Sequence, residues 1–241
     1  EAEGEEMRRD MVGRVVDDIL DRIADGRYSQ DRTLPSEVDL ATELDVSRLT
    51  VREAVKVLRE RGILRVVQGR GTYLTPRSAW TDLPTLISMT LRTTPEREVG
   101  LRLIEVRRMI EVGAAGLAAV HRCEADVRVL EECIERIDEA GDGQDVPAVV
   151  EADMAFHSSI MEASGNPFVP TIMIPLSQAF KASRAITSAD PEVRRRAQWH
   201  HREILRAIRS GDEQGAKDAM RSHMTQTRAD LLARISASDR N

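Results

Sequence analysis

Apolar residues recur at three- and four-residue intervals through most of this chain, which is the spacing of amphipathic helices. In residues 7–25 this repeat predicts a first helix. Two shorter helical patterns follow, and Ser36 and Ser47 stand before them, where a side chain can cap a helix N-terminus. Only Asp45 and Val46 separate the two patterns, so we expect a tight helix-turn-helix.

After Gly62 the helical spacing gives way to short β-branched runs. Residues 63–67 and 72–74 flank the loop Gln68-Gly69-Arg70-Gly71, which predicts a β-hairpin. A hairpin directly behind a helix-turn-helix is the layout of a winged helix-turn-helix, whose second helix enters the DNA major groove. We therefore expect a winged helix-turn-helix DNA-binding domain over residues 7–75.

The second part of the chain is helical in pattern almost throughout. Prolines and small polar residues without periodicity predict an interdomain linker at residues 76–85, followed by an all-helical domain over residues 86–235. Its expected breaks are Thr93-Thr94-Pro95, Gly141-Asp142-Gly143, Gly165-Asn166-Pro167, Asp190-Pro191 and Gly211-Asp212. About six helices joined by short loops bury their apolar stripes most simply as an antiparallel bundle. The expected fold class is mainly α, with an N-terminal winged helix-turn-helix and a C-terminal all-α bundle.

The composition is typical of packed helices and also indicates the cellular compartment. Aromatic residues make up only 3% of the chain. No apolar run approaches the ~18 residues that would suggest a membrane span, and no export signal is evident. The two cysteines match neither a zinc nor a thioredoxin spacing. We expect a cytoplasmic protein with reduced thiols and no membrane partner.

Charge is distributed unevenly along the chain. The formal net charge is −6, yet the stretch from Ser47 to Arg77 has eight basic residues against two acidic ones, a local charge of +6. Such a stretch suits a surface that faces phosphates, because each neutralised phosphate releases counterions. The alternative is a solvated charged helix, but that would not explain the capped helix pair and the basic hairpin.

Several motifs in this half resemble the DNA-binding domain of GntR-family bacterial transcription regulators. They are Leu34-Pro35-Ser36-Glu37, Val46-Ser47-Arg48, Val51-Arg52-Glu53-Ala54, Gly62 and Gly69-Arg70-Gly71-Thr72. The DNA-binding residues that we expect from this resemblance are Ser36, Ser47, Arg48, Thr50, Arg52, Gly69 and Arg70. It implies that Arg48 and Arg52 touch base edges or phosphates, that Ser47 and Thr50 meet the DNA backbone, and that Gly69-Arg70 enters the minor groove. Family members often have Arg where this chain has Val38, so recognition should depend more on the remaining arginines.

Four residues in the second half are candidate metal ligands: Asp153, His157, His201 and His223. Asp153 and His157 are four residues apart and so share a helix face, and each of the four lies on an apolar stripe. A buried carboxylate or imidazole needs a partner. One Asp and three His suit a divalent metal ion, most simply zinc, with nickel or manganese as alternatives.

A lone histidine is more often a hydrogen-bonded core or surface residue than a ligand. We interpret the two remaining histidines in that way. His121 lies near a helix C-terminus, and His200 is rotated by about 100° from His201.

The second half also resembles the FCD ligand-binding domain of the FadR-type GntR subgroup, over about residues 86–235. The resemblance rests on Asp153-x-x-x-His157, the Gly165-Asn166-Pro167 turn, the segment from His201 to Gly211-Asp212 and the segment from Ala216 to His223. The four ligand candidates match the metal-binding branch of that subgroup. The resemblance implies that the domain forms a homodimer and that the metal helps to hold a small organic acid.

An anionic effector also needs positively charged or donor groups from the protein. Arg107 matches a position where many relatives carry Arg, and its guanidinium can bind a carboxylate through two hydrogen bonds. The alternative for Arg107 is an ion pair with Glu111, four residues later. Arg184 and Asn166 are further effector-binding candidates, although Asn166 could equally be a helix cap.

These features predict a ligand-responsive transcription regulator, a repressor in its commonest form, and not an enzyme. Two copies would bind a palindromic operator in double-stranded DNA, and a small carboxylate effector would change how the copies present their DNA-binding domains. Two alternatives remain open: a regulator that senses the metal itself, and a metal-dependent enzyme with a nucleic-acid-binding module. Against the enzyme, no additional general base stands out near the ligands.

Overall fold

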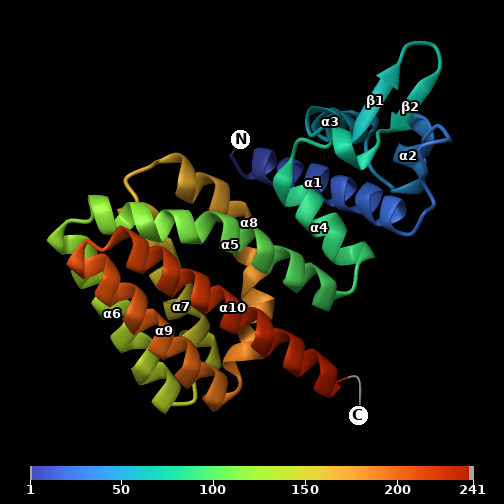
Figure 1. Ribbon diagram of the computed structural model, residues 1–241. Coiled ribbons are helices and arrows are strands. Elements are labelled where there is room, and N and C mark those ends of the chain that lie inside the picture. Colours follow the sequence, from blue (N-terminus) through green and yellow to red (C-terminus); the bar gives the residue numbers. More distant parts are fainter. Residues whose placement is uncertain (1, 239–241) are drawn as a thin grey trace. The chain divides into compact units, whose positions relative to one another are not determined.

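The computed structural model describes residues 2–238, apart from some side chains within its helices. It consists of two compact units, Glu1–Thr94 and Pro95–Asn241 (Figure 1). Each unit is built mainly of helices, and the one sheet among the described residues has two strands. The mainly α fold class predicted from the sequence is confirmed.

The first unit has the order of elements of a winged helix-turn-helix. Its elements are α1 (Ala2–Ala24), α2 (Glu37–Glu43), α3 (Arg48–Glu60), β1 (Leu64–Val67), β2 (Gly71–Leu74), the 3-10 helix η1 (Arg77–Ala79) and α4 (Leu83–Thr93). Helices α1 and α2 both pack against α3. The core between them contains Ile19, Leu40, Val51 and Leu58, all essentially inaccessible to solvent.

Both predicted N-caps of this unit are present. Ser36 Oγ accepts a hydrogen bond from Asp39 N, at 3.2 Å, and the Asp39 side chain accepts one from Ser36 N. Ser47 Oγ accepts a hydrogen bond from Thr50 N at 3.0 Å. Between the helices Asp45 has φ of 51°, a left-handed conformation that turns the chain sharply. These local interactions fix where the second helix begins.

The wing is an antiparallel hairpin in the register Leu64↔Leu74 to Val67↔Gly71. Gly69 and Gly71 have φ of 73° and 108°, values that other residues adopt only with strain. The wing is tied to the chain before α2, because Leu34 N donates a hydrogen bond to Thr72 O at 2.8 Å.

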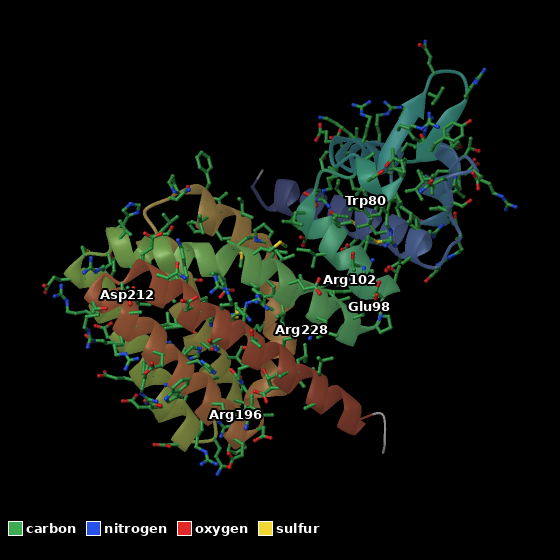
Figure 2. The ribbon with its side chains drawn as sticks, in the orientation of Figure 1. Trp80, Glu98, Arg102, Arg196, Asp212 and Arg228 are labelled. Carbon is green, nitrogen blue, oxygen red and sulfur yellow. The ribbon has the colours of Figure 1, made fainter. Side chains whose placement is uncertain are left out.

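Residues 76–85, the predicted linker, contain η1 and the start of α4 rather than only irregular chain. Trp80 is buried in the first unit's core, and its Nε1 donates to Thr75 O at 3.4 Å (Figure 2). Met89 is also buried in that core, and Arg92 pairs with Asp21 of α1. The division between the units therefore falls after Thr94, and residues 86–94, expected in the second domain, belong to the first. The apolar stripe of α4 packs against α1, and this long-range contact cannot be predicted from the local sequence pattern.

The second unit is an all-helical bundle. Its helices are α5 (Glu96–His121), α6 (Glu124–Asp142), α7 (Val146–Ala163), α8 (Phe168–Ser188), α9 (Pro191–Ser210) and α10 (Glu213–Ser238). All five predicted breaks coincide with helix ends. A further break, at Arg122 and Cys123, separates α5 from α6.

Helices distant in sequence lie side by side in this unit (Figure 1). Helix α5 packs along α10 and α7, while α6 packs on α7 and α9. Helices α9 and α10 form a hairpin around Gly211, which has φ of 75°. Charged pairs such as Arg196 with Asp230 lie on the outside (Figure 2). Among the described residues, no helix combines the length and apolar character that crossing a bilayer requires.

Candidate DNA interface and metal centre

The outer face of α3 is basic and accessible. Val51 and Leu58 are buried, whereas Arg48, Arg52 and Lys56 are exposed. This division follows from the 3.6-residue period of the helix. The three side chains thus remain available to a phosphate or to a base edge.

Arg52 is held in place from the neighbouring helix. Its Nε donates to Glu37 Oε2 of α2 at 3.1 Å, while its side chain remains 61% exposed. An exposed pair of this kind contributes little to stability, about 0–1 kcal/mol. Its effect is to restrict the directions in which Arg52 points.

Thr50 does not have the exposure expected of a residue that meets DNA. It is 7% exposed, and its hydroxyl lies 2.8 Å from Ser47 Oγ, where it completes the cap of α3. The contact of Thr50 with the DNA backbone stays a prediction, and the low exposure of its side chain leaves it little surface for such a contact. Its position in the first turn places it against the capping serine.

The wing carries Gly69 and Arg70 exposed at its tip. The guanidinium of Arg65 lies over the Tyr73 ring on the paired strand, 5.1 Å from its centroid. Tyr73 Oη in turn donates to Arg70 O at 3.3 Å. These contacts stiffen a hairpin that would otherwise be held by few backbone hydrogen bonds.

Three predicted metal ligands come together inside the second unit. His157 of α7, His201 of α9 and His223 of α10 each offer a ring nitrogen, and these atoms lie within 4.8 Å of one another. All three side chains are buried. Asp153 lies one turn before His157 on α7, and its Oδ1 is 3.2 Å from His201 Nε2. The structure thus brings together all four residues that the sequence grouped as ligands.

The tautomer of His201 follows from its neighbour Gln198. Gln198 Nε2 donates to the carbonyl oxygen of Ile134 at 2.8 Å and to Asp138 Oδ1 at 2.9 Å, so its Oε1 faces His201. His201 Nδ1 lies 2.9 Å from that oxygen and must donate to it. Nε2 of a neutral His201 therefore carries a lone pair, and this lone pair faces Asp153.

A lone pair and a carboxylate oxygen repel each other at 3.2 Å unless a cation lies between them. His223 Nδ1 is also buried, and it has no hydrogen-bond partner among the described residues. Unpaired buried nitrogens are costly, and a metal ion would satisfy both. The residues therefore fit a divalent ion held by imidazole nitrogens and one carboxylate.

His157 is oriented by a carboxylate that the sequence reading did not include in the site. Its Nδ1 lies 2.7 Å from Glu111 Oε2, and Arg107 Nε donates to Glu111 Oε1 at 2.6 Å. A carboxylate behind a histidine is a common arrangement at metal centres, where it fixes the tautomer and leaves Nε2 as the ligand. The sequence suggested Glu111 only as an ion-pair partner of Arg107. The structure has that ion pair and also the contact of Glu111 with His157.

Burial controls the charges in this cluster. It lowers the pKa of His201 and of His223 well below the usual value, and it lowers the pKa of His157 against the opposing effect of Glu111. Burial alone would raise the pKa of Glu111, but Arg107 and His157 bring it well below its usual range. The histidines are thus neutral, as metal binding requires, and Glu111 is ionised.

The effector candidates have different positions. Arg107 and Arg184 are both buried; Arg107 Nη2 is 3.4 Å from His157 Nε2, and Arg184 pairs with Asp153. Burial and the nearby charge of Arg107 lower the pKa of Arg184. Asn166 is exposed, and its Oδ1 accepts from Phe168 N at 3.0 Å. It thus bonds the backbone of the first residue of α8 from two positions before the helix, and the structure does not bring it to the cluster.

The other two histidines lie outside the ligand set. His121 ends α5, and its Nδ1 is 2.6 Å from Ser164 O. His200 is half-buried beside Trp199, with its ring 5.9 Å from that of His223.

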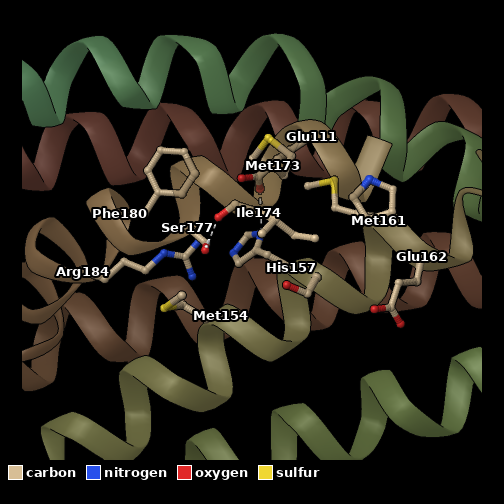
Figure 3. A pocket seen from close by; sticks show the side chains of 12 residues that line it. Glu111, Met154, His157, Met161, Glu162, Met173, Ile174, Ser177, Phe180 and Arg184 are labelled. Atoms are coloured by element: carbon tan, nitrogen blue, oxygen red, sulfur yellow. Dashed lines mark hydrogen bonds and ion pairs between the residues drawn. The ribbon is translucent and has the colours of Figure 1, made fainter. Parts of the chain in front are cut away.

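A cavity of about 120 Å³ adjoins the cluster between α5, α7 and α8. Glu111, His157 and Arg184 lie at its polar end, and Figure 3 shows the Arg184 guanidinium directed toward the His157 ring. The remaining wall is largely apolar. A small molecule in this cavity would contact groups that border the metal ligands.

Comparison with known proteins agrees with both units. Residues 11–74 match the bacterial regulatory proteins of the gntR family, and residues 102–226 match the FCD domain. This chain belongs to the GntR family, in the FadR-type group whose second domain is an FCD domain. It is accordingly a DNA-binding transcription regulator and not an enzyme.

Individual relatives cover nearly the whole chain. The HTH-type transcriptional regulator LutR of Bacillus subtilis (strain 168) is 31% identical over 210 residues, which are 84% of this chain and 93% of that protein. The galactonate operon transcriptional repressor of Escherichia coli (strain K12) is 27% identical, over 88% of this chain and 93% of the repressor. A solved structure, Streptococcus agalactiae GntR, is 30% identical, with a TM-score of 0.53 over 90% of this chain and 99% of the other.

Proposed function

We propose that this chain is a homodimeric repressor whose DNA affinity is set by a small carboxylate bound next to a divalent metal ion. The observation that carries the proposal is the contact between His201 Nε2 and Asp153 Oδ1, two acceptor atoms 3.2 Å apart inside a buried histidine cluster. That contact becomes favourable when a cation joins the two atoms.

The ion would be held by Asp153, His157, His201 and His223. Three imidazoles with one carboxylate suit zinc first, with nickel or manganese as alternatives. When bound, the ion supplies a positive charge that attracts a carboxylate. Arg184 is positioned to hold the same carboxylate, and Arg107 keeps Glu111 ionised behind His157.

The charge balance of the cluster supports an anionic effector. Arg107 and Arg184 offset Glu111 and Asp153, and the buried histidines are neutral. A divalent ion therefore leaves an excess of positive charge in a poorly hydrated site, and such charge favours a bound anion.

Exposed apolar residues on α5 and α8 support self-association. They are Met109, Val120, Phe168, Ile172 and Ile174, and each is at least half exposed. Large apolar side chains left exposed on a protein surface commonly mark a protein interface. A two-fold dimer would offer two copies of α3 to two half-sites, so its operator would be palindromic. The protein would act in the cytoplasm, on chromosomal DNA.

Selection of sites from random duplex DNA with the zinc-loaded full chain tests the DNA part of the proposal. Pseudo-palindromic sites bound by two chains are expected, and sites without two-fold symmetry would contradict the dimer. Bound zinc should be lost in the double variant His157→Ala/His201→Ala and retained in His200→Ala. If zinc alone, with no acid, switches DNA binding on or off, the protein is a metal sensor instead.

A further inference from the structure

We infer that the effector is an acid with its carboxylate at one end and an apolar body of about four to six carbon atoms. This inference rests on the proposed function and concerns the cavity beside the metal cluster. It excludes sugar acids and long dicarboxylates as the preferred ligands.

The buried ionisable groups of the cavity lie at one end. Arg184 and His157 border the metal cluster there, and Arg184 Nε is buried with no hydrogen-bond partner among the described residues. Glu111 lies at the same end, but both of its oxygens already accept hydrogen bonds from Arg107. A carboxylate placed at this end would meet a free donor and the metal together.

Away from that end the wall is built of apolar side chains (Figure 3). They are Met161, Pro170, Met173 and Ile174. Met154 and Phe180 also line the cavity, and they lie beside the Arg184 side chain. Two serines also line the cavity: Ser158 is exposed, and the hydroxyl of Ser177 donates to Ile174 O at 2.7 Å. A ligand hydroxyl against the methionine and isoleucine side chains would lose its hydrogen bonds to water with little replacement, which is unfavourable. Methionine side chains, in contrast, adapt readily to apolar ligands of irregular shape.

A second carboxylate has no partner at the far end. Among the described residues that line the cavity, Arg184 is the only basic one. Glu162 lies at the rim with its side chain exposed, and its negative charge would repel a distal carboxylate. The charges therefore match an acid that is ionised at one end only.

The volume limits the size of the apolar body. The cavity measures about 120 Å³. For comparison, an engineered apolar cavity of about 150 Å³ accepts benzene. A chain of four to six carbons, or a small ring, fills such a space, whereas a longer chain requires α8 to move.

Calorimetric titration of the zinc-loaded full chain with straight-chain acids from acetate to octanoate tests the inference. Affinity should rise about three- to fourfold for each added methylene until the cavity is full, near hexanoate, and then fall. Hexanedioate and gluconate should each bind at least tenfold more weakly than hexanoate. A series without dependence on length, or tighter binding of either polar acid, would overturn the inference.

The variant Met173→Gln keeps the side chain's length but makes the wall polar. It should weaken hexanoate binding about tenfold while leaving acetate affinity and bound zinc unchanged, and unchanged zinc would show that the fold is intact. Leu91→Gln is the matched control, because Leu91 is 40% exposed on α4 and belongs neither to the cavity nor to the exposed apolar residues of α5 and α8. An equal effect of the two substitutions, or none from Met173→Gln, would contradict the assignment of this wall.

Different results would overturn the apolar-acid inference and the proposed function. Metal-dependent binding of acids without preference for an apolar body would overturn this inference and leave the proposed function standing. Failure of every acid to bind the zinc-loaded protein would overturn both.

Discussion

The imidazole of His201 is held by a line of hydrogen bonds that begins at the protein surface. Arg202 pairs with Asp138, Asp138 accepts from Gln198, and Gln198 Oε1 accepts from His201 Nδ1. Each bond fixes the donor and acceptor of the next, so the lone pair of His201 Nε2 faces Asp153 and the proposed metal site. The orientation of a ligand on α9 thus depends on a residue of α6.

Gln198→Leu tests this positioning role. The substitution removes the acceptor of His201 Nδ1, and the loss of such an outer partner typically lowers metal affinity about 10–100-fold. Competition between the protein and a zinc chelator measures the change. Gln214→Leu is the control, because Gln214 is exposed and bonds only with Asp218 among the described residues. Equal zinc affinities for the two variants would show that Gln198 does not orient the ligand.

The buried histidines also predict how the stability of the metal-free protein depends on pH. Burial lowers the pKa of His201 and His223, so the folded state stays neutral where the unfolded state is protonated. The unfolded state then binds more protons, and the free energy of unfolding falls as the pH drops below about 6.5. The carboxylate of Glu111, whose pKa is lowered, reduces the free energy of unfolding further only near and below pH 4.5, the ordinary pKa of a glutamate.

Urea unfolding of the chelator-treated full chain, repeated at several pH values between 7.5 and 5.5, checks this dependence. In the variant Trp80→Phe, Trp199 on α9 is the remaining tryptophan, so its fluorescence reports the unfolding of the second unit. His223→Asn should flatten part of the slope, because an amide does not titrate. A stability that stays constant over this interval would contradict the assignment of neutral, buried histidines.

The sequence predicts some of these residues and not others for a physical reason. Asp153 and His157 share one face of one helix, so their spacing alone brings them together. Glu111 and Gln198 act across helices, and Gln198 meets Asp138 from 60 positions away. Arg107 and Glu111 have the spacing of an ordinary surface pair, and only packing shows that both are buried.

At the scale of elements, the first turn of α3 determines where this helix begins. Ser47 and Thr50 close the N-terminus, and the buried stripe behind them fixes which arginines face outward. The cap and the stripe are local patterns, so the sequence predicts the helix and the direction of Arg48 and Arg52. The burial of Thr50 depends on its contact with the cap, which a helical wheel does not include.

Arg52→Ala tests the function of that face. Loss of a base or phosphate contact should weaken binding to a selected operator by about 1–3 kcal/mol, or roughly 5- to 150-fold. Arg195→Ala, which removes an exposed arginine from α9, should leave the affinity unchanged. Fluorescence anisotropy at several salt concentrations measures both, and a lower salt slope would indicate a phosphate contact. Undiminished affinity of Arg52→Ala would remove the recognition-helix assignment.

Two other element boundaries show where local patterns stop being informative. The break between α5 and α6 has neither glycine nor proline, and Asp126 accepts a hydrogen bond from Cys123 N to begin α6. Helix α4 has an apolar stripe that suits a bundle, yet the stripe is buried against the first unit's core. Both outcomes are decided by tertiary contacts rather than by propensity.

At the scale of the whole molecule, the proposal requires that the effector site and the DNA-binding face influence each other. An effector shifts DNA affinity only by its differential affinity for two states of the protein, typically 1–3 kcal/mol. Linkage is reciprocal, so DNA should change the affinity for the effector by the same factor. Dimerisation would make this coupling effective, because two recognition helices must reach two half-sites together.

The most direct test of the central claim is anisotropy of a selected operator with zinc-loaded full chain, measured with and without the acid that binds most tightly. The acid should weaken DNA binding about 5- to 150-fold, and removal of zinc or the double variant His157→Ala/His201→Ala should abolish its effect. An identical response to the acid with and without the metal, or no response to any acid that binds, would contradict a metal-assisted effector site.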